Sequence, residues 1–367
     1  MTPNHALAYL RQICCSGLSR EIAIAEFLRS VPLLIPSNSN TFSVTDKLLR
    51  PNYHLAGFDV GDMAAVIHAI ADEFHTPARS KRAASWFSRH TAVRDPKIMD
   101  ESFYMTDFYN LIYRQFDMHH VLWVRIPLNV DNSGVVGLYR PANQNPFDSR
   151  DQTQLMRLMP YVFHAYQAAN EVNFEPSPDG TSGMMIMNTQ GDMLYQSPEA
   201  KLLLREARFP RLLTDQRAED RLQAKLAELC GNLRRIYRGQ EAPPPSFTHA
   251  GPNGQFQFRA YWLDGCQRQP DGLIGFVIEH REPLVLKVLR GMRDLPLSPT
   301  QRDVALLLAR GLTLEQICSR LHIKPSTLKD HICKIYQKLD IHQREELLPK
   351  LLTLSRKAHD GSVVTLN

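Results

Sequence analysis

The stretch that decides the fold of the C-terminal part of this 367-residue chain is residues 297–348, LSPTQRDVALLLARGLTLEQICSRLHIKPSTLKDHICKIYQKLDIHQREELL. Within it, Ser298–Gln301 and Thr313–Gln316 each place a hydroxyl side chain three residues before a glutamine, the capping-box pattern at a helix start. Gly311 stands where a left-handed residue commonly ends a helix. The stretch therefore predicts two helices that begin at Pro299 and Leu314.

A third helix is predicted over residues 325–339, because its apolar side chains recur at spacings of three and four. These residues should form one buried stripe: Leu328, Ile332, Ile335, Tyr336 and Leu339. The helix before it is expected to bury Leu314, Ile317 and Leu321. Between the two helices, residues 322–324 form a turn of the length that a helix-turn-helix requires.

Charge is concentrated in the same region. Residues 297–357 hold eleven Lys and Arg against six Asp and Glu, a surplus of five that equals the net charge of the whole chain, +5. The remaining residues are therefore near neutral. This distribution is typical of a chain with one DNA-binding end.

The stretch resembles the DNA-binding domain of the LuxR family of regulators, most specifically in Ser326-Thr327-Leu328-Lys329 followed by His331, and in Arg310-Gly311-Leu312. The resemblance implies that the helix from Pro325 enters the major groove of double-stranded DNA. It also implies that a fourth helix, Arg344 to Leu354, supports a homodimer.

The same resemblance places Lys329, Asp330 and Cys333 toward the bases, and Thr327 and Lys338 near phosphates. The full set of expected DNA-binding residues is Lys324, Ser326, Thr327, Lys329, Asp330, Cys333, Lys334, Gln337 and Lys338. Many relatives carry neutral or basic side chains at the positions of Asp330 and Cys333, so their operator cannot be transferred to this chain. An aspartate can accept a hydrogen bond from a cytosine amino group.

Two further domains are predicted upstream, which makes the fold class multidomain: two α+β sensor-like domains followed by an all-α four-helix helix-turn-helix domain. Residues 1–172 combine helical patterns (to Arg29, Val60–Phe74, Met99–Phe116 and Ser149–Glu171) with two strand-like runs around Asp131–Gly134. The final hairpin and helix of this block resemble a GAF domain.

A second upstream domain is predicted over residues 180–283, after a linker-like composition in 173–183. It shows five short strand patterns with helix between the second and the third. GMMIMNTQGDMLYQSPEAKLLL, near its start, resembles a PAS domain. Residues 284–296 are expected to form a connecting helix, and residues 297–357 the DNA-binding domain.

Aromatic side chains concentrate between residues 86 and 123, where they predict either a small-molecule pocket or ordinary core packing. The candidates for lining a pocket are Trp86, Tyr104, Tyr109 and Trp123. The tryptophan, tyrosine and aspartate pattern of acyl-homoserine-lactone receptors is absent from the sequence. The sequence does not indicate which cofactor, if any, the chain binds.

Other function classes find little support in the sequence. It contains no G-x-x-x-x-G-K, H-E-x-x-H or G-x-S-x-G motif, so we expect no catalytic residues and no enzyme. The six cysteines lack metal-ligand spacing, so no metal site is expected. The absence of long apolar runs and of an export signal favours a cytoplasmic protein without a membrane partner.

Two alternatives to a ligand-gated or partner-gated transcription regulator remain. One is an enzyme in the upstream domains with a regulatory DNA-binding tail, which the missing motifs disfavour. The other is an adaptor that uses the helix-turn-helix to bind protein, which the basic face of Lys329, Lys334 and Lys338 disfavours.

Overall fold

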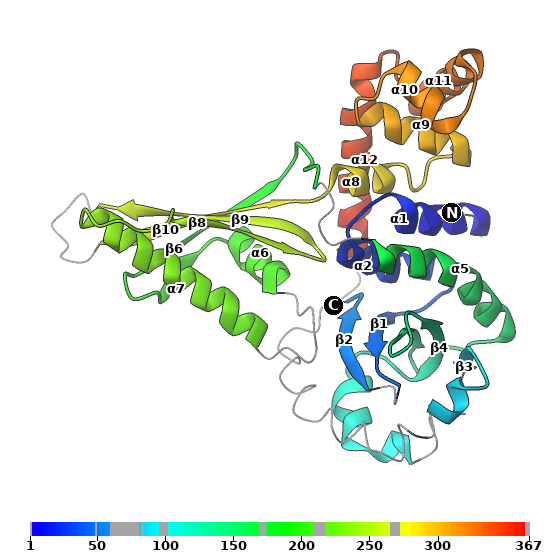
Figure 1. The fold of residues 1–367 in the computed structure, drawn as a ribbon, viewed down its shortest axis with the longest axis horizontal. Helices are drawn as coiled ribbons and strands as arrows, with labels where there is room; N and C mark the ends of the chain where they lie inside the picture. Colours follow the sequence, from blue (N-terminus) through cyan, green and yellow to red (C-terminus); the bar gives the residue numbers. More distant parts are fainter. Residues whose placement is uncertain are drawn as a thin grey trace.

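The chain folds into two sheet-containing units and a helical C-terminal unit, as Figure 1 shows. The computed structural model describes residues 2–47, 50–58, 81, 84–94, 102–168, 174–208, 217–264 and 272–363. The helix expected over Val60–Phe74 lies outside these residues. No helix in the described ranges is long and apolar enough to cross a membrane.

The N-terminal unit (residues 2–168) is built on an antiparallel sheet with the strand order β2-β1-β5-β4-β3. Three helices, α1, α2 and α5, share one apolar core with one face of this sheet. The elements are α1 (Pro3–Cys15), α2 (Arg20–Ser30), β1 (Ser39–Thr45), β2 (Pro51–Ala56), β3 (Ala92–Arg94), β4 (His120–Pro127), β5 (Ser133–Arg140) and α5 (Ser149–Gln167). The two expected strand runs, β4 and β5, and the closing helix α5 are confirmed.

The opposite face of this sheet is covered by an aromatic segment that departs from the expected helix over Met99–Phe116. Residues 102–116 instead form a 3-10 turn, η2 (Phe103–Met105), and a π-helical stretch, η3 (Tyr109–Tyr113). Phe103, Phe108 and Ile112 are all buried, and the five-residue step between the first two exceeds one α-helical turn. The prediction of a regular helix was wrong because these buried side chains come from positions that do not share one face of an α-helix.

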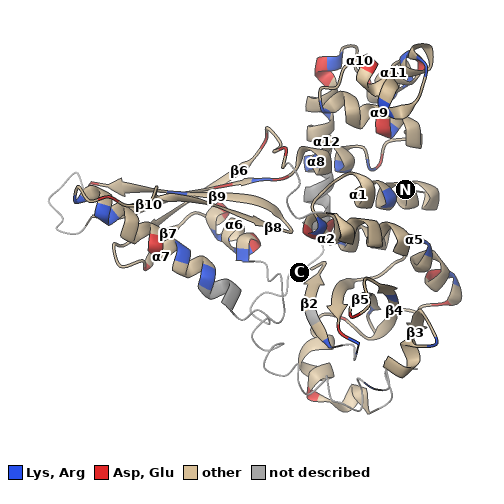
Figure 2. Ribbon diagram, in the orientation of Figure 1, with Lys and Arg blue, Asp and Glu red and all other residues tan. Residues whose placement is uncertain are grey.

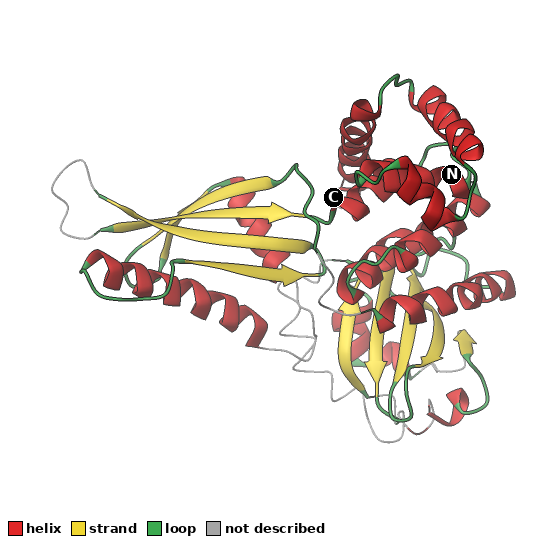
Figure 3. Ribbon diagram, turned by 45° about the horizontal axis from the view of Figure 1, so that its top comes forward, coloured by secondary structure: helices red, strands yellow, loops and turns green. Residues whose placement is uncertain are grey.

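The middle unit (residues 181–281) contains a second antiparallel sheet, with the order β7-β6-β10-β9-β8. Its strands are β6 (Thr181–Met187), β7 (Met193–Gln196), β8 (Ser246–Gly251), β9 (Gly254–Leu263) and β10 (Leu273–Arg281), with α6 (Pro198–Arg208) and α7 (Arg217–Tyr237) along one face (Figure 3). The five predicted strands are confirmed. Both sheets place their strands in the same sequential order: second, first, fifth, fourth, third.

One glycine lets a helix and a strand of the middle unit approach closely. A Cβ atom on Gly183 of β6 would lie 2.4 Å from the backbone nitrogen of Ala200 in α6. A side chain at this position would therefore push α6 away from the sheet.

The helical C-terminal unit (residues 284–363) contains α8 (Leu284–Gly291), α9 (Pro299–Ala309), α10 (Leu314–Leu321), α11 (Pro325–Leu339), η4 (Arg344–Glu346) and α12 (Leu347–Val363). Helix α8 ends at Gly291, so the connecting helix is shorter than the expected 284–296. Every residue of α8 except Lys287 is buried. This helix is a packing element rather than an exposed connector.

Helix α8 lies between α12 and the N-terminal helices, and the three share one core (Figure 1). A Cβ atom on Gly291 would lie 2.1 Å from the carbonyl oxygen of Leu351, so the missing side chain permits the close approach of α8 to α12. The N-terminal unit and the helical unit are therefore joined by a continuous apolar core.

Residues 174–180, expected to belong to a linker, are held against neighbouring elements. Pro176 forms a β-bridge with Pro283, and Ser177 is fully buried. The linker composition did not reveal these contacts, because they are made to residues about a hundred positions further along the chain.

Candidate nucleic-acid interface

Capping boxes set the starts of α9 and α10 as the sequence predicts. Ser298 Oγ accepts a hydrogen bond from the Gln301 backbone N–H at 3.3 Å, and Gln301 Oε1 accepts one from the Ser298 N–H at 3.0 Å. Thr313 and Gln316 repeat this arrangement at 3.2 and 2.9 Å. Gly311, with φ +82°, follows the end of α9.

A three-residue turn joins α10 to α11. His322 has φ 54°, in the left-handed region, and the Ile323 N–H bonds to the Cys318 carbonyl at 3.1 Å. Lys324 is extended, and Pro325 opens α11 with the backbone angle that a first helical position needs. The turn therefore redirects the chain sharply between the two helices of a helix-turn-helix.

The buried side of α11 anchors it to the other helices. Leu328, Ile335 and Leu339 are almost fully buried, and Ile332 and Tyr336 are half-buried. The predicted apolar stripe is therefore confirmed. Its position orients the opposite side of α11 toward solvent.

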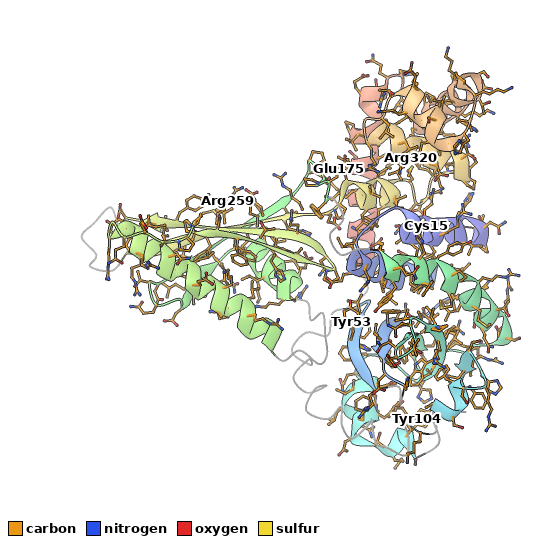
Figure 4. All side chains as sticks on the ribbon, viewed as in Figure 1. Cys15, Tyr53, Tyr104, Glu175, Arg259 and Arg320 are labelled. Carbon is orange, nitrogen blue, oxygen red and sulfur yellow. The ribbon has the colours of Figure 1, made fainter. Side chains whose placement is uncertain are left out.

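That opposite side carries the residues expected to bind DNA. All nine have exposed side chains: Lys324, Ser326, Thr327, Lys329, Asp330, Cys333, Lys334, Gln337 and Lys338. Lys and Arg colour parts of α10 and α11 in Figure 2, at the end of the molecule far from the N-terminal sheet. Arg320 of α10, labelled in Figure 4, is exposed in the same region and is not among the nine predicted DNA-binding residues.

Leu314 does not take the buried position expected for it. It is 44% exposed, whereas Ile317, one turn later, is fully buried and Leu321 is half-buried. Helical side chains lean toward the turn N-terminal to their own Cα, and Leu314 at the first helical position has no such turn to cover. The expectation for Leu314 was therefore wrong.

Lys338 has partners inside the helical unit. Its Nζ donates hydrogen bonds to the Pro296 carbonyl at 2.7 Å and to Gln301 Oε1 at 2.9 Å. The lysine thus ties the end of α11 to the capping box of α9. A phosphate contact by Lys338 has to share or replace these bonds.

Several arginines of the basic surplus also serve structure. Arg302 is buried and donates to the carbonyls of Met292, Arg293, Leu295 and Leu297. Burial lowers the pKa of this guanidinium. Arg344 donates to the Leu308 and Leu312 carbonyls. These charges hold loops in place, a role that a count of basic residues does not distinguish from DNA binding.

The aromatic candidates for a ligand pocket separate into two places. Tyr104 (labelled in Figure 4), Tyr109 and Trp123 join the cluster on the N-terminal sheet. Trp86 packs against His90 with the rings tilted by 32° at a centroid distance of 4.3 Å, and its Nε1 donates to the Ala92 carbonyl.

Polar atoms in the aromatic cluster pair with one another. Trp123 Nε1 donates to Tyr139 Oη at 3.0 Å, and Tyr139 also hydrogen-bonds Tyr113 and Thr41. Tyr109 Oη lies 2.6 Å from His119 Nδ1. Burial raises the pKa of Tyr113 well above its ordinary value. The cluster is therefore a packed aromatic layer whose rings are also linked by hydrogen bonds.

Metal-ligating side chains do not gather within the described ranges: no group of three or more His, Cys, Asp or Glu there could hold an ion. Five cysteines are free thiols: Cys14, Cys15, Cys230, Cys318 and Cys333. Cys266 lies outside the described residues.

The sequence from the segment before α9 to the first turn of α12 matches a known family. Residues 295–350 match the model of the family described as bacterial regulatory proteins, luxR family. These residues form a LuxR-type helix-turn-helix domain. The family match covers the helical unit only, so the two sheet-containing units stand outside it.

Curated relatives agree with this match over a short region. Three proteins named HTH-type transcriptional regulators, one from Mycobacterium bovis and two from Mycobacterium tuberculosis, are each 30% identical to this chain over 95 residues. The shared region is 26% of this chain and 10% of each relative, so it spans about a tenth of their length.

One solved structure is also similar to this chain: the crystal structure of the phage VqmA-DPO complex. It aligns with 50% of this chain and 84% of that chain, at 21% identity and a TM-score of 0.18. A TM-score of this size does not establish a common arrangement.

Proposed function

We propose that this chain is a sequence-specific, DNA-binding transcription regulator that acts by binding rather than by catalysis. The observation that carries the proposal is the two-sided α11: its apolar side is buried, and all nine expected DNA-binding residues lie exposed on the other side and at its start. A helix of this kind presents side chains to base edges in the major groove while its back packs on its own domain.

The experiment is a binding titration of the purified chain against promoter fragments of its own genome, at several salt concentrations. Specific binding should be tighter to some fragments than to random DNA. The logarithm of the binding constant should fall linearly with the logarithm of the salt concentration. Equal affinity for every fragment would contradict sequence-specific regulation.

Two lysines on α11 allow a matched comparison in the same assay. Lys329→Ala should weaken operator binding more than random DNA, because Lys329 is proposed to reach a base edge. Lys338→Ala should weaken both alike, because it removes a proposed phosphate contact and also the bonds that tie the end of α11 to Pro296 and Gln301. Lys350→Ala is the control, because Lys350 is an exposed lysine on α12, outside the reading helix. The assignment of Lys329 fails if its variant loses equal affinity for both DNAs.

We further propose that the N-terminal and middle units are GAF-like and PAS-like sensor domains that gate DNA binding through a small ligand or a protein partner. Their five-stranded antiparallel sheets, each carrying helices on one face, support this proposal. For the N-terminal unit, Trp86, Tyr104, Tyr109 and Trp123 remain the proposed ligand contacts. The paired hydroxyls of the aromatic cluster mean that a ligand there would have to rearrange Tyr139 and its neighbours.

A homodimer in the cytoplasm is the proposed working form, since helix-turn-helix proteins commonly read two half-sites with two copies. Over residues 347–356 of α12, whose side chains the structure describes, no leucine is fully exposed to a partner. Leu347, Leu351 and Leu352 of α12 are buried within the chain. Light scattering with and without operator DNA measures the proposed dimer directly.

A further inference from the structure

The junction between the middle unit and the helical unit contains a short segment that contacts both. We name residues 174–180 the strap. It enters the middle unit beside the place where the chain leaves it, and Glu175 is labelled there in Figure 4. The Ser177 N–H donates to the Glu282 carbonyl and the Leu284 N–H donates to the Glu175 carbonyl, each at 2.9 Å. The two connections to the middle unit are therefore hydrogen-bonded to each other and must move together.

The strap carries two carboxylates, and each pairs with an arginine of the helix-turn-helix unit. Glu175 Oε2 lies 3.0 Å from Arg310 Nε, at the end of α9. Asp179 Oδ2 lies 3.2 Å from Arg356 Nε, on α12. The strap thus touches the DNA-binding unit at two helices.

Asp179 is also tied to α8. Its Oδ1 lies 3.0 Å from Lys287 Nζ, and the Ser177 hydroxyl donates to the same carboxylate. Burial by itself raises the pKa of Asp179, but these hydrogen bonds and the charge of Lys287 outweigh burial and lower that pKa. Asp179 is therefore ionised at neutral pH and attracts the cations of both helices.

A second set of ion pairs holds α8 to the rest of the chain. Arg290 donates to Glu26 of α2 at 3.0 and 2.6 Å, and to Glu282 at the end of β10 at 2.6 Å. The side chains of Arg290 and Glu26 are only 8% and 5% exposed. Breaking such a pair leaves a buried charge without its partner, which is costly.

Exposure separates the strap's ion pairs with α9 and α12 from the ion pairs of α8, among which Lys287 and Asp179 are only 13% and 11% exposed. Arg356 is 67% exposed, and the Glu175–Arg310 pair is partly exposed at both side chains. Ion pairs in contact with water contribute little and open readily. A movement of the middle unit should therefore release α9 and α12 from the strap while Arg290 keeps α8 on the N-terminal unit.

We propose that the strap transmits the state of the middle unit to the DNA-binding unit, with Glu175 and Asp179 as a releasable clamp and Arg290 as the fixed pivot. This inference rests on the proposed function only in one respect, namely that release of the clamp changes DNA binding. The clamp itself can be measured without DNA.

The first test uses amide hydrogen exchange on the full-length chain. Glu175→Gln with Asp179→Asn should make α12 exchange at least roughly threefold to tenfold faster, because the partly exposed pairs with Arg310 and Arg356 are lost together with the more buried Asp179–Lys287 pair. The N-terminal sheet should not change. The control is Glu228→Gln with Glu241→Gln, which alters the net charge equally and removes the exposed Lys225–Glu228 pair in the middle unit. Equal exchange of α12 in the two double variants would overturn the clamp.

The second test asks whether the middle unit acts through the strap. Gly183→Ala forces α6 away from β6. Whether the middle unit is then displaced or unfolded, its state is changed without any substitution in the strap. It should speed exchange in α12 in the wild-type background and add little in the Glu175→Gln/Asp179→Asn background. Transmission through the strap is refuted if Gly183→Ala leaves α12 unchanged, or if its effect is the same in both backgrounds. If the wild-type chain binds no DNA specifically, the proposed function is refuted, but the two exchange experiments still test the clamp.

Discussion

Replacing Glu26 by glutamine should lower the free energy of unfolding by about 3 kcal/mol at pH 7. The carboxylate accepts two hydrogen bonds from Arg290, one from Tyr9 Oη at 3.2 Å, and longer ones from Arg29 and Ser30. Burial alone raises the pKa of Glu26, but the charge and hydrogen bonds of Arg290 outweigh it and lower that pKa from 4.5 to about 2. A shift of this size corresponds to roughly 3 kcal/mol of stabilisation by the ionised form. Glutamine keeps the shape of the side chain and removes the charge.

The sign of the pH dependence follows from the lowered pKa. The contribution of Glu26 is fully present above its unfolded-state value near 4.5 and is lost as the pH falls toward 2. The stability difference between wild type and Glu26→Gln should therefore be constant between pH 5 and 7. It should shrink steadily below pH 4.5.

Urea unfolding at several pH values, followed by circular dichroism, measures this difference. The control is Glu241→Gln, because Glu241 is exposed and its substitution should change stability by less than about 0.5 kcal/mol. A stability difference for Glu26→Gln that stays the same from pH 7 to pH 3 would show that the loss comes from altered packing rather than from charge.

Three further substitutions test separate parts of the structure. Gly291→Ala should lower the free energy of unfolding, measured with urea, by about 1 to 3 kcal/mol, because its Cβ would meet the Leu351 carbonyl and push α8 away from α12. Ile317→Ala should cost about 2 to 5 kcal/mol in the same assay, while Leu314→Ala should cost under about 1 kcal/mol, as their different burial requires. Lys329→Ala should weaken operator binding by about 1 to 3 kcal/mol in fluorescence anisotropy and leave the unfolding curve unchanged.

The parts of the fold that follow from short-range patterns could be predicted from the sequence. Capping boxes at Ser298 and Thr313 depend on residues three positions apart, and the turn before Pro325 depends on three residues. The strands of the middle unit are likewise marked by local alternation and by turn residues such as Asn253-Gly254. Each of these features stabilises a local conformation, so one sequence is enough to reveal it.

The features that could not be predicted depend on partners distant in the sequence. Nothing near Arg290 indicates that it binds Glu26, which lies 264 positions earlier. Gly291 lies inside the helix predicted over residues 284–296, and no local pattern reveals that it permits the close approach of α8 to Leu351 of α12. The strap was expected to be a linker for the same reason, since its composition is that of a loop and its contacts are made by tertiary packing.

At the candidate site, too, the sequence reveals the local excess of charge but not the tertiary contacts that each charged side chain makes. The basic surplus correctly marked the helical unit, but the structure uses its arginines and lysines differently. Of the five arginines, four bind carbonyls or carboxylates of this chain (Arg302, Arg310, Arg344 and Arg356), and Arg320 is exposed. A guanidinium offers several donors in a planar fork, which suits it to holding loops and helix ends together. Lysines, as flexible point charges, can reach the phosphates of a duplex, and Lys324 and Lys334 lie exposed beside or on the reading helix, near Lys329, the proposed base reader. The surplus therefore reports two physical tasks, and only the exposed part of it can attract DNA.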